Sequence, residues 1–471
     1  MTYPHTQLFI DGQWQDAADA RTLAVFNPAS GQEIGRVAHA GKPDLDRALA
    51  AAQKGFETWR DTPAAERSKI MRRAAALMRE RAGDIAGLLT QEQGKPLAMA
   101  KGEMFGAVAT IQGFAAMDLP EKVLKEDATT RIVQRRTPLG VVASITPWNF
   151  PMILLMLKVP PALLAGNTVV AKPAPTTPLT TLRFGELCAE ILPPGVVNVI
   201  TDQNDLGDAL TSHPDVAKVA FTGSTATGKK VMASVAGTLK RLTLELGGND
   251  AAIVLDDVDP KEIAPKIFNA AMFNTGQVCL AAKRAYIPDA IYDEVCAELA
   301  KLADAAVVGN GLAADTQLGP VQNKMQYEKI KGYIADGKAR GKIIAGGEDV
   351  DGPGYFIRPT IVRDIPDDAR LVCEEQFGPV LPVLRYKNLD DAIARANSTD
   401  YGLGATVWTS NPERGYEVAC RIQSGTVWVN KHLDLPTEVP FSGAKQSGFG
   451  TEMGQAGLEE FTQSRIINLA K

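Results

Sequence analysis

The sequence predicts an α/β protein with a doubly wound parallel sheet, a second α/β region and a small β element. Two observations support this prediction. In the middle of the chain, short strands that are apolar on both faces alternate with helical segments, which is typical of a parallel sheet covered by helices. A further set of such strands follows, and the chain ends in one more strand-like stretch. Because ligands of doubly wound sheets bind beyond the carboxyl ends of the strands, we expect the functional residues there.

The first helices are predicted from the spacing of apolar residues. Between Ser68 and Gln93 these residues recur with mostly helical spacing, and Gly94-Lys95-Pro96 ends the pattern. Residues 41–118 are therefore expected to be mainly helical. The strands predicted after them are 141–145, 167–172, 196–200, 218–221 and 241–245, with helices over 179–191 and 228–236 between them.

A second α/β region is predicted from about Ala251 to Gly443. Its clearest strands are 251–255, 284–287 and 426–429. Glu121–Arg136 has the pattern of a polar hairpin, and Ser464–Leu469 that of a terminal strand. Terminal strands of this kind often pair with another sheet or another subunit.

The composition excludes several classes of function. The 471 residues are enough for about two to four domains. The net charge is −5 with both signs mixed along the chain, so we expect no nucleic-acid partner. The most apolar run, Met152–Leu157, is too short to span a bilayer, and Met1–His5 lacks the pattern of a signal peptide. Five scattered cysteines without a CxxC, and four scattered histidines, predict a reducing cytoplasmic location without disulfides or a metal site.

Three residues form the main functional hypothesis. Cys279 follows the small, amide-rich turn Gly276–Val278; a lone cysteine is usually a small buried hydrophobe, but this context favours a nucleophilic thiol. Glu245 ends a strand before Gly247-Gly248 and is either a strand-end surface carboxylate or a general base that activates water. Asn149 is either a turn asparagine or an oxyanion donor acting with the Cys279 amide. A thiol and a separate base are the two groups needed to oxidise an aldehyde through a thioester.

Two further stretches suggest a nucleotide. Phe221–Gly228 follows a strand and opens a helix, where a phosphate meets a helix N-terminus. It nearly matches a P-loop, but Lys230 stands where Ser or Thr binds magnesium, and a plain helix start explains it equally well. Glu374–Pro379 is an acidic turn with one aromatic residue; it either packs its phenylalanine or holds a ribose by its hydroxyls.

In this order and spacing, the stretches resemble the aldehyde dehydrogenase superfamily of NAD(P)-dependent, non-phosphorylating enzymes, from Phe26-Asn27-Pro28 to 440–448. The resemblance implies that Cys279 is the nucleophile, that Glu245 is the base, and that Asn149 with the Cys279 amide forms the oxyanion hole. The implied cofactor is NAD or NADP, and the substrate a small-molecule aldehyde. The implied cofactor contacts are Ile145, Trp148, Lys172, Pro175, Gly223, Ser224, Glu375 and Phe377.

The resemblance also implies a domain layout and an oligomer. Residues 1–118 and 139–247 are expected to form a Rossmann-like dinucleotide-binding domain. Residues 248–446 are expected to form the catalytic domain, and 119–138 with 447–471 a β oligomerisation element. The expected assembly is a homodimer or a homotetramer.

Three departures from the family pattern bear on specificity. Many relatives that prefer NAD have a glutamate three positions after the lysine, where this chain has Pro175; the lost carboxylate favours NADP or dual use. Asn249 stands where lysine is frequent, and the sequence offers no interpretation. The expected substrate pocket has no evident arginine, which favours an apolar aliphatic or aromatic aldehyde; a semialdehyde or aminoaldehyde stays open because His432 and Glu438 lie in this region of the sequence. The expected pocket residues are Phe150, Leu154, Leu157, Val278, Leu280, Leu435 and Phe441.

Three rival functions follow from the same residues. A CoA-acylating enzyme of the superfamily generally lacks the glutamate base, whereas Glu245 is present. A non-catalytic binding protein on the same scaffold usually loses the nucleophile or the oxyanion amide, and both are present. A P-loop ATPase is disfavoured by Lys230 and by the lack of a second acidic strand motif.

Overall fold

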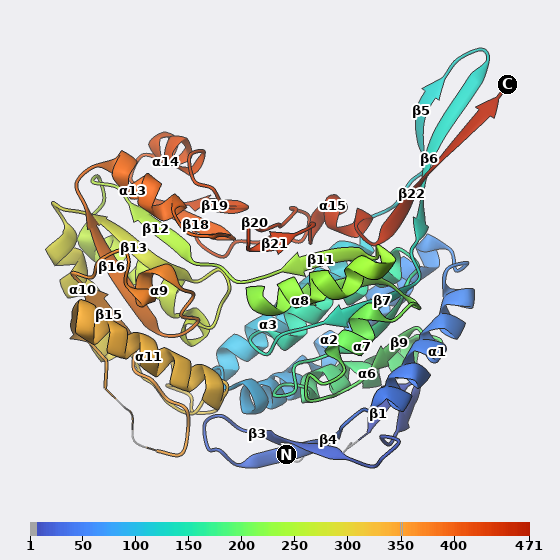
Figure 1. Cartoon of the computed structure of the whole chain (residues 1–471), viewed down its shortest axis with the longest axis horizontal. Helices are drawn as coiled ribbons and strands as arrows, with labels where there is room; N and C mark the ends of the chain where they lie inside the picture. The colour runs from blue at the N-terminus through green and yellow to red at the C-terminus, as the bar shows by residue number, and fades with distance from the viewer. Residues whose placement is uncertain (1–6, 349, 351) are drawn as a thin grey trace.

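The computed structural model describes residues 7–348, 350 and 352–471. Two α/β bodies lie side by side, and a three-stranded arm projects from one of them (Figure 1). Within the described residues, no helix has the length and apolar character needed to cross a membrane. The N-terminal residues that lack a signal-peptide pattern, Met1–His5, lie outside the described part of the chain.

The first body is built on an eight-stranded sheet in the order β2-β1-β9-β8-β7-β10-β11-β21. Its five central strands are parallel, and the strand order reverses between β7 and β10 because β8 and β9 lie on one side of β7, and β10 and β11 on the other. This reversal is the switch point at which doubly wound sheets bind ligands. The strands are β1 (Leu8–Ile10), β2 (Gln13–Gln15), β7 (Val141–Ile145), β8 (Thr168–Lys172), β9 (Val197–Val199), β10 (Val216–Thr222), β11 (Arg241–Glu245) and β21 (Gly448–Phe449).

Helices cover both faces of this sheet, and each face has its own apolar core. One core is formed with α2 (Ala64–Gln93), α3 (Leu97–Ala115), α4 (Pro151–Met156), α5 (Val159–Leu164) and α6 (Leu179–Ile191). The other is formed with α1 (Lys42–Trp59), α7 (Gly207–Ser212) and α8 (Thr225–Val235). A short hairpin of β3 (Thr22–Phe26) and β4 (Glu33–Ala38) lies at the foot of this body.

The second body has a seven-stranded sheet in the order β14-β15-β16-β13-β12-β18-β19, in which only β14 is antiparallel to its neighbour. Its strands are β12 (Asp250–Val254), β13 (Ala282–Pro288), β14 (Lys342–Ala345), β15 (Thr360–Arg363), β16 (Val380–Tyr386), β18 (Gly404–Trp408) and β19 (Thr426–Val429). Its helices are α9 (Pro260–Met272), α10 (Tyr292–Ala305), α11 (Lys324–Arg340), α12 (Arg370–Cys373), α13 (Leu389–Asn397) and α14 (Pro412–Ala419). The pair β17 (Tyr401–Gly402) and β20 (Ala444–Lys445) lies beside it.

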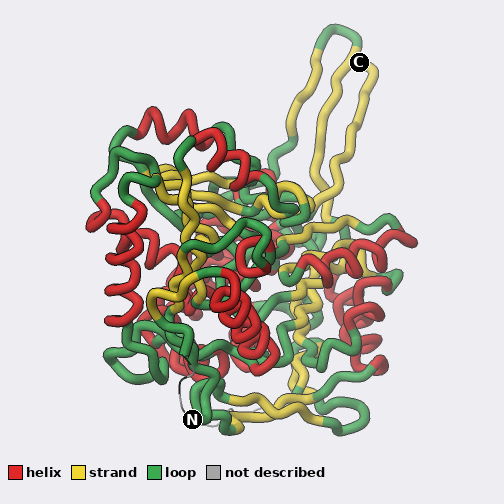
Figure 2. Tube along the Cα trace, turned by 60° about the vertical axis from the view of Figure 1, so that its left-hand side comes forward, coloured by secondary structure: helices red, strands yellow, loops and turns green. Residues whose placement is uncertain are grey.

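The arm consists of β5 (Lys122–Glu126), β6 (Thr130–Pro138) and β22 (Thr462–Ala470), with β6 in the centre. It extends well beyond both bodies, and the C-terminus lies at its tip (Figure 2). Of the residues grouped with the arm from the sequence, only β22 joins it in the range 447–471; β21 pairs with β11, and α15 (Gly454–Glu459) lies between them.

The structure confirms the predicted α/β class and most predicted elements. The helix expected from Ser68 to Gln93 begins four residues earlier, at Ala64, and all five strands predicted for the first sheet are present. The four strands before residue 41 were missed. They are short, and their burial patterns are not uniformly alternating, so neither period-2 alternation nor an apolar run marks them.

Candidate active site

The predicted site residues of the first body lie along one edge of its sheet. Ile145 of β7 is in register with Lys172 of β8 and with Phe221 of β10, and Thr222 is in register with Glu245 of β11. These are the carboxyl ends of parallel strands, so their following loops meet at the switch point.

Cys279 is brought to this edge by a strained turn. The preceding residues Asn274, Thr275 and Gly276 have positive φ values of 49°, 57° and 70°, a conformation that non-glycine residues seldom adopt. At Gly276 a side chain has no room, because a Cβ would lie 2.2 Å from the carbonyl oxygen of Gly378. The turn therefore packs directly against the loop that carries Glu375 and Phe377.

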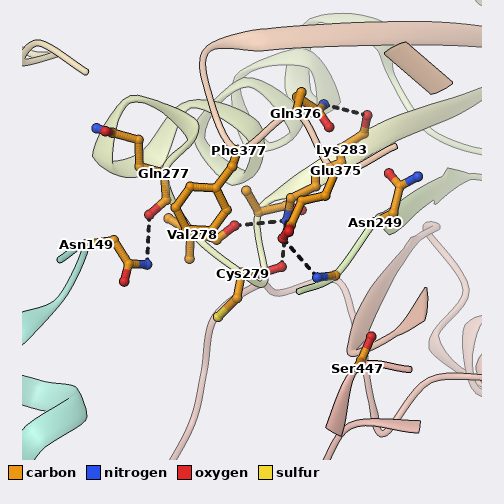
Figure 3. Close-up of polar contacts among 12 residues, drawn as sticks. Asn149, Asn249, Gln277, Val278, Cys279, Lys283, Glu375, Gln376, Phe377 and Ser447 are labelled. Carbon is orange, nitrogen blue, oxygen red and sulfur yellow. Dashed lines mark hydrogen bonds and ion pairs between the residues drawn. The ribbon is translucent and has the colours of Figure 1, made fainter. Parts of the chain in front are cut away.

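Buried hydrogen bonds hold this turn against Asn149. The Asn149 Nδ2 donates to the carbonyl oxygen of Gln277 over 3.0 Å (Figure 3), and the Asn274 Nδ2 donates to the carbonyl oxygen of Asn149 over 3.1 Å. The side chain of Gln277 donates to the carbonyl of Asn274 and accepts from the backbone N–H of Gln322. Each of these side-chain amides thereby fixes a backbone carbonyl of the turn or of Asn149. The Asn149 amide has two N–H groups, and the second one is left for another acceptor.

A buried ion pair of Lys95 and Glu103 holds the backbone of Asn149 in place. Lys95 Nζ lies 2.5 Å from Glu103 Oε2, and it donates to the Asn149 carbonyl over 2.8 Å. The same ammonium lies 3.7 Å from the centre of the Phe150 ring. Glu103 in turn accepts from the backbone N–H of Met152 at the start of α4. The loop that carries Asn149 is thus fixed at both ends.

Glu245 lies in a buried position near the thiol. Its side chain is buried, and among the described residues the thiol of Cys279 is its hydrogen-bond partner. Burial raises the pKa of Glu245 to about 8, and the nearby charge of Glu452 adds to this, whereas Lys158 opposes it. Lys158 Nζ bonds Glu452 Oε1 at 2.5 Å and Thr222 Oγ1 at 2.7 Å. A carboxylate with a raised pKa is a stronger base once it is ionised.

The thiol of Cys279 is also affected by its surroundings. Burial raises its pKa, the charge of Glu245 raises it further, and Lys283 opposes these effects. The charge of Glu245 makes ionisation of the thiol less favourable, whereas the hydrogen bond with the thiol lowers the pKa of Glu245, so the titrations of the two groups are linked.

The predicted cofactor residues lie along the same edge, at strand ends and in loops of both bodies. Lys172 Nζ bonds Asp202 Oδ1 at 2.7 Å and Asn204 Oδ1 at 2.9 Å. Pro175 is half-buried in the turn after β8. Ser224 caps α8, because its hydroxyl accepts the N–H of Thr227, and Gly223 precedes it.

The second body contributes the other side of this edge. Glu375 Oε1 accepts the backbone N–H of Gly248 over 2.9 Å, and burial raises the pKa of Glu375. The ring of Phe377 stands edge-on to Trp148, with 5.4 Å between the ring centres. The two bodies therefore meet along the predicted cofactor residues.

The seven predicted pocket residues belong to one apolar cluster next to Cys279. Leu154, Leu157, Val278, Leu280 and Phe441 are buried in it, and Phe150 and Leu435 pack against it. His432 lies beside this cluster; burial lowers its pKa to about 4, and the charge of Lys283 adds to this. Glu438 is exposed.

Comparisons with known proteins agree with this arrangement. The family model "Aldehyde dehydrogenase family" matches residues 14–467. The chain belongs to the aldehyde dehydrogenase family. It is 39% identical to retinaldehyde dehydrogenase 3 of Rattus norvegicus, over 98% of this chain and 93% of that protein, and 39% identical to phenylacetaldehyde dehydrogenase of Pseudomonas fluorescens, over 99% and 96%.

Solved structures of the aldehyde dehydrogenase family have the same fold. The NAD+ complex of an aldehyde dehydrogenase from Bacillus cereus matches with a TM-score of 0.97 and 36% identity, over 99% of this chain and 96% of that one. An NADP-dependent enzyme of E. coli also matches with a TM-score of 0.97 and 36% identity, over 99% and 98%. The chain is accordingly an NAD(P)-dependent aldehyde dehydrogenase, an enzyme that oxidises aldehydes.

The sequence analysis missed the buried charged residues of this aldehyde dehydrogenase. Lys158, Lys283 and Asp250 each interrupt or adjoin an apolar stretch, and all three are buried in the structure. A charged residue inside an apolar run indicates a buried partner, but it does not say which residue that partner is. Asn249, for which the sequence offered no interpretation, has a structural role. Its side-chain Nδ2 donates to the backbone carbonyl of Val372, and its backbone carbonyl accepts hydrogen bonds from the guanidinium group of Arg284.

The close packing of Gly276 against Gly378 predicts that adding one methyl group at residue 276 lowers the activity strongly. In Gly276→Ala, the Cβ collides with the Gly378 carbonyl and forces a positive φ on alanine. We expect NAD(P)H formation to fall at least about tenfold, since a misplacement of about 1 Å is enough for such losses. The measurement is steady-state aldehyde oxidation.

Gly83→Ala is the matched control, because Gly83 lies exposed in α2 and a Cβ there meets nothing within 4 Å. That variant is expected to keep its activity and to gain a little helix stability. Native activity in Gly276→Ala would contradict the conclusion that the turn packs too closely against Gly378 to admit a side chain.

Proposed function

We propose that this enzyme oxidises an apolar aliphatic or aromatic aldehyde to the carboxylic acid with NAD(P)+, through a thiohemiacetal and a thioester on Cys279. The observation that carries the proposal is the convergence of a half-buried thiol, a buried carboxylate next to it and a hydrogen-bonded amide beside one apolar cluster. A nucleophile, a base and an oxyanion donor are the groups that this chemistry requires.

Each of the three groups has a distinct task in the proposed reaction. The thiolate of Cys279 adds to the aldehyde carbon, and the Asn149 amide with the Cys279 N–H stabilises the resulting oxyanion. The cofactor, when bound, accepts the hydride that converts the thiohemiacetal to a thioester. Glu245 then takes a proton from water, which attacks the thioester and releases the acid. Burial strengthens these electrostatic interactions but also raises the pKa of Glu245 to about 8, so its proton is lost only near that pH.

The site offers suitable contacts for a dinucleotide. The carboxyl ends of β7 and β8 provide Ile145 and Lys172, and the loops after them provide Trp148 and Pro175. Gly223 and Ser224 lie at the start of α8, near a helix N-terminus, where a pyrophosphate is favoured. The Glu375 carboxylate accepts only one backbone N–H among the hydrogen bonds of the described residues, so it retains acceptor capacity for ribose hydroxyls. Pro175 supplies no carboxylate, and on this ground we propose NADP or dual use.

The apolar cluster supports an apolar aldehyde as substrate. The seven predicted pocket residues all belong to this cluster and are apolar, so none of them would hold a carboxylate. Two relatives of similar identity are named for retinaldehyde and phenylacetaldehyde, both of which carry hydrocarbon groups. A semialdehyde or aminoaldehyde is the second candidate. The exposure of Glu438 and the lowered pKa of His432, which keeps this imidazole neutral, favour it less.

The arm supports a homo-oligomeric enzyme. Its β5 is an edge strand, and Val123 and Leu124 on it are exposed, as are Ile466 and Leu469 on β22. An exposed strand edge with apolar side chains is a template for pairing with another chain. We propose a dimer or a tetramer formed through the arm, a cofactor domain around the first sheet, a catalytic domain around the second, and a cytoplasmic location.

The proposed reaction is tested with a panel of aldehydes and NAD or NADP, by the absorbance of the reduced cofactor. We expect phenylacetaldehyde and aliphatic aldehydes to be oxidised by the native protein, and Cys279→Ala to lose all activity because no other group forms the thioester. Cys420→Ala, which removes an exposed cysteine, is the control and is expected to retain native activity. Full activity in folded Cys279→Ala would refute the nucleophile, and no activity of the native protein with any aldehyde would refute the function.

Pro175→Glu tests the basis of cofactor choice. A carboxylate at this position accepts the ribose hydroxyls of NAD and repels the 2′-phosphate of NADP. We expect kcat/KM for NADP to fall by about tenfold or more, since 1.4 kcal/mol corresponds to a factor of ten, whereas NAD is used equally well or better. Pro175→Gln, of nearly the same size but without the charge, is the control. A drop for NADP that is equal in both variants would show that charge is not the cause.

A further inference from the structure

Lys283 is a buried lysine between the proposed nucleophile and the proposed ribose carboxylate. It lies near the start of β13 and is 1% exposed. Its Nζ donates to the carbonyl oxygens of Val278 over 2.9 Å and of Cys279 over 2.5 Å, and it lies 3.8 Å from Oε1 of Glu375. Figure 3 shows the ammonium between these groups, with the sulfur of Cys279 pointing to the other side. One cation thus joins both halves of the site.

The contact with Val278 acts on the proposed oxyanion hole. The Val278 carbonyl and the Cys279 N–H belong to the same planar peptide unit, so fixing one fixes the other. In a trans peptide the two bonds point in opposite directions, and an ammonium at the oxygen therefore aims the N–H away from Lys283. A charged donor at the carbonyl also polarises the unit and makes its N–H a stronger donor.

The contact with Glu375 acts on the proposed cofactor contact. Burial raises the pKa of Glu375, and the positive charge of Lys283 opposes this, so the lysine favours the ionised form that accepts ribose hydroxyls. Gln376 strengthens the link, because its Nε2 donates to the carbonyl oxygen of Lys283 over 3.0 Å. The loop that carries Glu375 is thereby attached to the side chain and to the backbone of one residue.

Other titratable groups also act on this region. Glu245 on β11 and Asp250 on β12 both raise the pKa of the Cys279 thiol, whereas Lys283 lowers it. Burial raises the pKa of Asp250 to about 7, and Lys283 again opposes this. His432 is neutral above a pH of about 4. Lys283 thus lowers the pKa of the Cys279 thiol, of Asp250 and of Glu375, while Arg284 also acts on Asp250 and Lys329 on Glu375.

We propose that Lys283 is a positioning residue: its ammonium aims the Val278–Cys279 peptide at the oxyanion and holds Glu375 ready for the ribose. The inference rests on the proposed function for the roles of Cys279 and Glu375. It adds a residue whose side chain touches neither the aldehyde carbon nor the thiol, and it makes the two halves of the site depend on one charge.

The test is Lys283→Met, which keeps the length of the side chain and removes its charge and donors. At saturating substrates we expect the rate of the first hydride transfer to fall by about tenfold or more, a part of the 10²–10³ lost with a whole oxyanion donor. The KM for the aldehyde is expected to change little, and the Kd for NADH or NADPH to rise. The pH midpoint for alkylation of Cys279 by iodoacetamide, followed by peptide mass, is expected to move upward because a cation that favours the thiolate is gone.

The controls separate loss of fold from loss of position. Lys218→Met removes another fully buried lysine, whose Nζ bonds Thr243 in the first sheet, and it is expected to leave the alkylation midpoint unchanged. Lys283→Gln retains an amide donor without the charge; if Lys283→Met does not fold, the alkylation midpoint and the hydride-transfer rate of this variant decide in its place.

An unchanged hydride-transfer rate, or an unchanged alkylation midpoint, in a folded Lys283 variant overturns the inference. The alkylation experiment needs neither aldehyde nor cofactor. If the native protein transfers hydride to no cofactor, the proposed function fails, and the alkylation midpoint alone then decides whether Lys283 acts on the thiol.

Discussion

The site depends on how the turn before Cys279 is held. Three successive residues with positive φ end at Gly276, which lies against the carbonyl of Gly378, and Cys279 follows three residues later. Such a conformation costs on the order of 1–3 kcal/mol for each non-glycine residue, and it persists only where the surroundings fix it. Here the amides of Asn149, Asn274 and Gln277 provide that fixation, and they are buried. The same bonds that stabilise the strained turn also orient the proposed oxyanion donor.

Buried charge pairs extend this rigidity into both bodies. Lys95 with Glu103 supports the Asn149 loop, and Lys158 with Glu452 lies beside Glu245. Burying such pairs costs desolvation energy, so they add little net stability compared with apolar residues of the same shape. Their value in this enzyme lies in geometry and in electrostatics. They fix the loops at the switch point and set the charge environment in which the thiol of Cys279 and the proposed base Glu245 titrate.

The sequence predicted the fold where a pattern was local. Runs that are apolar on both faces marked β7, β8, β10 and β11, and the position of Glu245 at a strand end followed from them. The three catalytic candidates also came from short stretches, and the structure brings them to one edge. The charge partners were not readable, because they are set by tertiary packing: Glu452 lies 294 residues from Lys158, and Glu375 lies far along the chain from Lys283. A sequence shows that a buried lysine needs a partner, but the fold decides which one it obtains.

The most direct test of the account is the mass of the Cys279 peptide from Glu245→Gln after incubation with phenylacetaldehyde and NAD(P)+. Without the base, the thioester forms but is hydrolysed slowly, so the account predicts a phenylacetyl group on Cys279 together with reduced cofactor in an amount no greater than the enzyme. The native protein, treated in the same way, is predicted to carry no adduct and to release phenylacetate continuously. Continuous turnover by folded Glu245→Gln, or an acyl group on any other cysteine, would contradict the account.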